Sequence, residues 1–234
     1  MARLARAVAP GWPHHVTQRG SRRQRTFFAQ SDYAAYLSLM GEWCGRHEVR
    51  ILAYCLMPNH VHLIVVPATA EGLCRAIGEA HRRYTRRVNF RKGWRGHLWQ
   101  GRFASFVMDE AYLVSAARYV ERNPVKAGLV RRAEDWAWSS AAAHVSGGED
   151  GVAETAWLAE LTAGWVCTWG EYLRDEEDGA FAASMRRHER TGCSLAERPS
   201  CRRWSPSSPA CSCRRSLADL RGPGNSMMSP DSVV

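Results

Sequence analysis

The alternation of hydrophobic and polar residues predicts a mixed order of strands and helices in the first 145 residues. Runs rich in Val, Ile, Leu and aromatic residues predict strands over 14–20, 49–57, 60–67 and 104–109. Apolar residues at helical spacing predict helices over 31–47, 71–90 and 110–124. This order predicts an α+β fold, a ferredoxin-like sandwich with helices on one face of an antiparallel sheet and the other face free to bind a ligand.

The composition divides the chain into three parts. Residues 1–145 carry the predicted sheet and helices. Residues 146–192 begin with the linker "SGGEDG" and continue as an acidic, partly helical extension. Residues 193–234 are rich in Ser, Pro, Arg and Cys without any periodicity, so we expect this tail to be disordered.

Positive charge is concentrated in the first part. The whole chain has a net charge of +9, whereas residues 1–145 hold 22 Lys and Arg against 10 Asp and Glu, a net +12. Such an excess favours a polyanionic partner. No apolar run approaches the roughly 20 residues that span a bilayer, so we expect a cytoplasmic protein without membrane contact. Cys44, Cys55 and Cys74 stand singly within predicted elements, which is typical of small core residues.

The predicted strand over 60–67, "HVHLIVVP", carries two histidines. Side chains two residues apart in a strand point to the same face, so His60 and His62 project together while Val61 turns into the core. Two neutral imidazoles on one side can share a metal ion. The alternative is a pair of histidines that face water at the edge of a sheet.

The third predicted helix places Tyr119 and Asn123 four residues apart, on one face and one turn from each other. Tyr119 offers a phenol, and Asn123 offers an amide oxygen, which is a hard metal ligand. The alternatives are a core tyrosine and an asparagine that ends a helix before Pro124.

A basic segment, "HRRYTRRVNFRKGWR" (81–95), surrounds a second candidate nucleophile, Tyr84. Tyr84 is followed four residues later by Val88 and not by an amide. Aromatic residues among arginines suit contacts with bases and phosphates, although a solvated helix face is the alternative. Our candidates for DNA contact are Arg22, Arg23, Arg25, Arg82, Arg83, Arg86, Arg87 and Arg102.

Four motifs occur in order: "MPNHVHLIVVP", "LWQGRF" (98–103), "ARYVERNPVKAGLV" (117–130) and "WAWSS" (136–140). Together they resemble the REP-associated tyrosine transposases, which belong to the single-tyrosine HUH superfamily with a transposase IS200-like domain. The resemblance covers roughly residues 10–145. It implies that His60 and His62 bind a divalent metal, Mg²⁺ or Mn²⁺, with Asn123 as the third polar ligand and Tyr119 as the nucleophile.

The resemblance also implies an activity. A transposase of this kind nicks single-stranded or hairpin DNA at REP-like palindromes through a 5′-phosphotyrosine intermediate, and it works as a monomer or a homodimer. Two other interpretations stay open. The first is an inactive or domesticated nucleic-acid-binding protein, since RNA-binding domains share this topology. The second is a replication or conjugation HUH endonuclease, which shares the histidine pair.

Overall fold

A computed structural model describes residues 8–164, 167–175, 179, 183 and 185. The tail that we expect to be disordered lies outside the described residues. Within the described part, no helix is both long and apolar enough to cross a bilayer.

Four strands form one antiparallel sheet in the order β2-β3-β1-β4. The strands are β1 (His14–Arg19), β2 (Val49–Met57), β3 (His60–Pro67) and β4 (Ala104–Val107). The two-residue turn Pro58-Asn59 joins β2 to β3, because both residue types favour tight turns. The α+β ferredoxin-like fold is confirmed, and β3 is a central strand.

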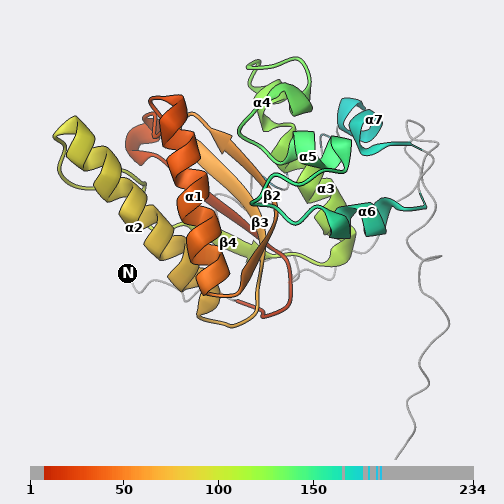
Figure 1. Cartoon of the computed structure of the whole chain (residues 1–234), viewed down its shortest axis with the longest axis horizontal. Coiled ribbons are helices and arrows are strands. Elements are labelled where there is room, and N and C mark those ends of the chain that lie inside the picture. Colours follow the sequence, from red (N-terminus) through yellow and green to blue (C-terminus); the bar gives the residue numbers. More distant parts are fainter. Residues whose placement is uncertain (1–7, 165–166, 176–178, 180–182, 184, 186–234) are drawn as a thin grey trace, which may run out of the picture.

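Helices cover both faces of this sheet (Figure 1). The first two, α1 (Gln30–Arg46) and α2 (Gly72–Lys92), pack with Val61, Leu63 and Val65 in one core. On the opposite face, α3 (Glu110–Glu121) packs with Ile64 and Phe106 in a second core. The expectation of a free sheet face is therefore wrong. The apolar side of α3 needs a surface to bury, and the second face of the sheet supplies it.

Among the described residues beyond α3, four short α-helices add to the second face. These are α4 (Asn123–Lys126), α5 (Ala141–Ser146), α6 (Ala156–Thr162) and α7 (Trp169–Arg174). The helix predicted over 110–124 breaks after α3, and Pro124 stands in the first turn of α4, where its missing N–H costs nothing. Leu158 of α6 and Trp169 of α7 belong to the second core, so part of the acidic extension packs on the domain.

Two of the three cysteines expected in the core are buried there, Cys44 and Cys55. Cys74 is exposed, which corrects our expectation. It lies on the outer face of α2, since Leu73, Ala76 and Ile77 take the inward positions of this helix.

Candidate active site on the α3 face of the sheet

The histidine pair of β3 lies on the face covered by α3. Val61 enters the core beneath α1 and α2, so its neighbours His60 and His62 point the opposite way. Their ring centroids are 4.9 Å apart, with the rings nearly perpendicular. His62 is buried and His60 is partly exposed. One imidazole therefore reaches solvent while the other sits inside the protein.

Tyr119 of α3 joins this pair from the opposite layer. Its ring centroid lies 5.9 Å from that of His62, edge to face. The side chain is only 4% exposed, and the Lys126 ammonium of α4 lies 4.2 Å from the ring centroid. The structure thus brings together two of the predicted metal ligands, the predicted nucleophile and a cation that our sequence reasoning did not select.

His15 of β1 is a further member of the cluster that sequence reasoning missed. Its Nε2 lies 3.0 Å from Nδ1 of His62, and the two rings stack 5.2 Å apart and nearly parallel. The edge of Phe106 packs against the His15 ring. The alternation of side chains along β1 could have revealed His15. Val16 faces the core of α1 and α2, so its neighbour His15 must face α3.

Burial keeps all three imidazoles neutral at pH 7. It lowers the pKa of His15 to about 3, and burial together with the Arg19 charge lowers the pKa of His60 to about 4. The pKa of His62 is also lowered well below its usual value, first by burial and then by the charge of His60. A neutral imidazole has one nitrogen lone pair, which is the form that binds metal ions.

Asn59 fixes the tautomer of His60. Its Oδ1 lies 2.7 Å from Nδ1 of His60, and an amide oxygen only accepts, so the proton is on Nδ1. The lone pair is therefore on Nε2, available for a metal. The Nδ2 of the same amide donates to the backbone oxygen of Arg23 at 3.1 Å. Asn59 thus links the predicted ligand His60 to the basic loop of Arg22 and Arg23.

His62 and His15 share one hydrogen bond, so their tautomers are coupled. For Nε2 of His62 to bind a metal, its Nδ1–H must donate to Nε2 of His15, whose own proton is then on Nδ1. That Nδ1 is buried and has no hydrogen-bond partner among the described residues. The donor set therefore fits a metal in one tautomer, and that tautomer leaves one buried N–H unsatisfied.

Asn123 stands at the start of α4, one turn beyond Tyr119. Its Nδ2 donates to the backbone oxygens of Tyr119 at 2.9 Å and of Val120 at 3.3 Å. The amide oxygen takes no part in these two bonds. Among the described residues, no group of three or more His, Cys, Asp or Glu is placed to hold a metal. Within the described residues, this finding leaves the amide oxygen of Asn123 as the third ligand of our interpretation.

Tyr84 lies on the other side of the sheet. It is fully buried in the core of α1 and α2, and its hydroxyl donates to the Thr26 backbone oxygen at 2.8 Å. Burial raises its pKa. The sheet separates Tyr84 from the histidine pair, so the structure favours Tyr119 of the two candidate tyrosines.

The predicted DNA-contacting arginines are all exposed, and they lie on α2 and in the two segments 21–25 and 97–103. Arg22 and Arg23 have left-handed backbones, with φ of 54° and 60°, which is uncommon for residues with a side chain. Arg102 and Arg82 line a cavity of about 340 Å³ between α2 and the 97–103 loop. Trp99 of that loop is buried, so its ring packs inside the protein.

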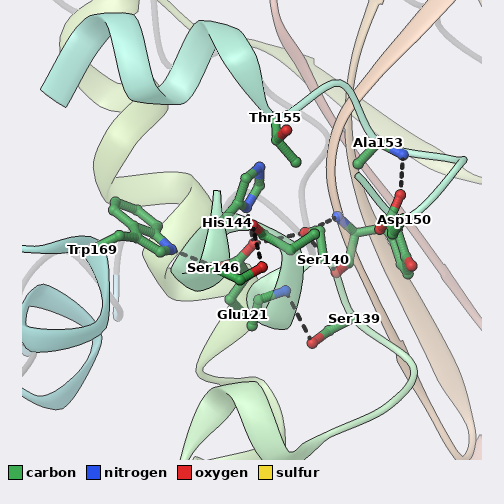
Figure 2. A network of polar contacts seen from close by, with 12 residues as sticks. Glu121, Ser139, Ser140, His144, Ser146, Asp150, Ala153, Thr155 and Trp169 are labelled. Carbon is green, nitrogen blue, oxygen red and sulfur yellow. Dashed lines mark hydrogen bonds and ion pairs between the residues drawn. The ribbon is translucent and has the colours of Figure 1, made fainter. Parts of the chain in front are cut away.

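A buried carboxylate holds α3 against the rest of the second face (Figure 2). Glu121, two residues beyond Tyr119, accepts bonds from Ser140 Oγ at 2.6 Å, His144 Nδ1 at 2.5 Å and Trp169 Nε1 at 2.9 Å. The backbone N–H of Tyr54 in β2 also donates a hydrogen bond to Ser140 Oγ, at 3.0 Å. The motifs "YVERNP" and "WAWSS" therefore meet in one hydrogen-bond network.

Comparison with known proteins agrees with this geometry. Residues 12–123 match the family model "Transposase IS200 like". A curated protein of Haemophilus influenzae, which carries the name REP-associated tyrosine transposase, is 27% identical over 130 residues. That alignment covers 50% of this chain and 74% of the relative. The resemblance read from the motifs is thereby confirmed.

A solved structure supports the fold independently. It is described as a REP-associated tyrosine transposase bound to a REP hairpin, and it superposes with a TM-score of 0.54. The match covers 67% of this chain and 91% of the other, at 21% sequence identity.

Proposed function

We propose that this chain nicks single-stranded DNA beside a hairpin and joins the cut end to Tyr119. The observation that carries the proposal is the cluster of His60, His62 and Tyr119, contributed by facing layers of the fold. The transposase family and the hairpin-bound structural relative support DNA as the substrate.

The chemistry is a phosphoryl transfer to a phenol. The Tyr119 oxygen attacks phosphorus, the bond to the 3′ oxygen breaks, and a 5′-phosphotyrosine forms. The phenolic proton leaves, and the departing 3′ oxygen gains one. The new ester conserves the energy of the phosphodiester, so strand transfer needs no nucleotide triphosphate.

The neutral imidazoles of His60 and His62, with the amide oxygen of Asn123, would hold Mg²⁺ or Mn²⁺. When bound, such an ion is a Lewis acid that stabilises charge on the phosphoryl oxygens. Lys126 adds a positive charge beside the Tyr119 ring, where the phenol loses its proton.

The exposed arginines of the 21–25 loop and of α2 would contact the phosphates of a hairpin. REP-like palindromes are the first substrates to test, because the hairpin-bound relative has the same fold. The protein would act as a monomer or a homodimer.

The test is covalent capture. End-labelled hairpins from the DNA that flanks the gene are incubated with the wild type, Tyr119→Phe and Tyr84→Phe, in Mn²⁺, Mg²⁺ or EDTA, and are analysed on denaturing gels. We expect a metal-dependent protein–DNA adduct that Tyr119→Phe abolishes and Tyr84→Phe retains. An adduct that only Tyr84→Phe removes would overturn the assignment, and binding without any adduct would favour the inactive binding protein.

A further inference from the structure

The tip of α2 carries a large apolar side chain in an unusual setting. Phe90 is 90% exposed, the highest value among the exposed large hydrophobic side chains of the described residues. It follows Arg86 by four residues and Arg87 by three, so it lies one turn above both on the same helix face. Arg82 and Arg83 form the turn below. Phe90 therefore continues a stripe of four arginines.

Two arginines on the same helix face as Phe90 are available for a ligand. Arg82 is bonded to Glu79, and the Arg83 guanidinium stacks over Trp43. Arg86 and Arg87 are exposed and form no ion pair with any described residue. An exposed aromatic ring beside unpaired guanidinium groups is the arrangement that proteins use to bind single-stranded nucleic acid.

The end of α2 lies at the same end of the sheet as the candidate active site. The Trp94 ring, just beyond α2, packs edge-on against Phe28 at 5.6 Å. Phe28 follows the loop of Arg23, and Asn59 ties that loop to His60. These contacts connect His60, through the loop of Arg22 and Arg23, to the segment just beyond α2.

We propose that Phe90 stacks on an unpaired base of the strand that extends from the hairpin, while Arg86 and Arg87 contact its phosphates. This inference rests on the proposed function and names the part of the substrate that α2 would bind. A base inside a duplex has its faces covered, so only an unpaired base can stack on the ring. A second copy of this chain is a poor occupant, because its own arginines would repel those of α2.

The experiment compares one stem with three ends: blunt, with a ten-nucleotide 5′ dT extension, or with a 3′ one. Fluorescence anisotropy measures affinity in a Tyr119→Phe background, so no adduct forms. Phe90→Ala is compared with Phe90→Leu, Phe90→Trp and a control at another exposed apolar residue, Leu129→Ala.

We expect Phe90→Ala to weaken binding of one extended hairpin by about 5- to 150-fold, which is the range for loss of one stacked base. Binding of the blunt hairpin and the Leu129→Ala control should not change. Phe90→Trp should restore the affinity and Phe90→Leu should not, since leucine has no aromatic face. The double variant Arg86→Gln with Arg87→Gln should lower the slope of log affinity against log salt concentration by about 1.4. This value corresponds to about 0.7 for each lost phosphate contact.

Equal losses for blunt and extended hairpins, no loss for either, or full affinity in Phe90→Leu would overturn the stacking role. A wild-type dimer in sedimentation that Phe90→Ala converts to a monomer would also overturn it. The anisotropy assay measures binding alone. A failure of Tyr119 to form an adduct would therefore overturn the proposed function, but it would not decide whether Phe90 stacks on a base.

Discussion

Replacing Glu121 by alanine should destabilise the protein more than any surface substitution. The carboxylate is fully buried and accepts hydrogen bonds from Ser140, His144 and Trp169. The Ser140 hydroxyl keeps a second acceptor, the Tyr54 backbone oxygen at 3.3 Å, so losing its bond to Glu121 should cost little stability. The His144 and Trp169 N–H groups would be left unsatisfied, at about 1–3 kcal/mol each. We therefore expect the free energy of unfolding to fall by about 2–6 kcal/mol.

Urea unfolding followed by tryptophan fluorescence measures this loss, with Glu160→Ala as the control, since Glu160 is an exposed glutamate of α6. Trp169→Phe keeps a ring in the core and removes one donor, for about 1 kcal/mol. In the Glu121→Ala background the same change should restore about 1–3 kcal/mol, because it removes the N–H that is left without an acceptor. A loss below about 1 kcal/mol in Glu121→Ala, or additive losses in the double variant, would refute the network.

The network also has a consequence for activity, because Glu121 lies two residues beyond Tyr119 on α3. We expect Glu121→Ala, at a temperature where it is folded, to slow adduct formation more than it weakens hairpin binding. Equal effects on both would show that Glu121 supports the fold without positioning the nucleophile.

Two further substitutions test the charge and strain of the site. Buried neutral His15 binds its proton only below about pH 3, against about 6.5 when unfolded, so wild-type stability should fall as pH drops below 6.5. His15→Phe should make the loss of stability between pH 7 and pH 5 smaller by about 2 kcal/mol. Urea unfolding at the two pH values, without metal, measures this difference. An unchanged pH dependence would contradict a buried neutral His15. Arg23→Gly should raise the free energy of unfolding by about 0.5–1 kcal/mol, because glycine accepts φ of 60° without strain. The same variant should bind the hairpin more weakly when affinity is measured by fluorescence anisotropy. A variant that is less stable than the wild type, or that binds as well as the wild type, would contradict this account.

The sequence by itself determined the local features of this protein. Strand alternation placed His60 and His62 on one face opposite Val61, and helical spacing placed Tyr119 and Asn123 one turn apart. Both placements follow from the repeat of side-chain directions, which is two residues in a strand and 3.6 residues in a helix. These repeats can be recognised within one short segment of sequence. The order of motifs was enough to indicate the resemblance to the REP-associated tyrosine transposases.

The tertiary structure decided which of these local features meet. The sequence did not show that α3 packs on the second sheet face, which brings Tyr119 to His62 and leaves Tyr84 in the opposite core. His15 reaches His62 only through the β1–β3 pairing, 47 residues apart, and Glu121 joins partners as distant as Trp169. Such contacts depend on how whole elements pack, and that packing is set by the fit of their apolar surfaces across the fold rather than by the residues beside each one.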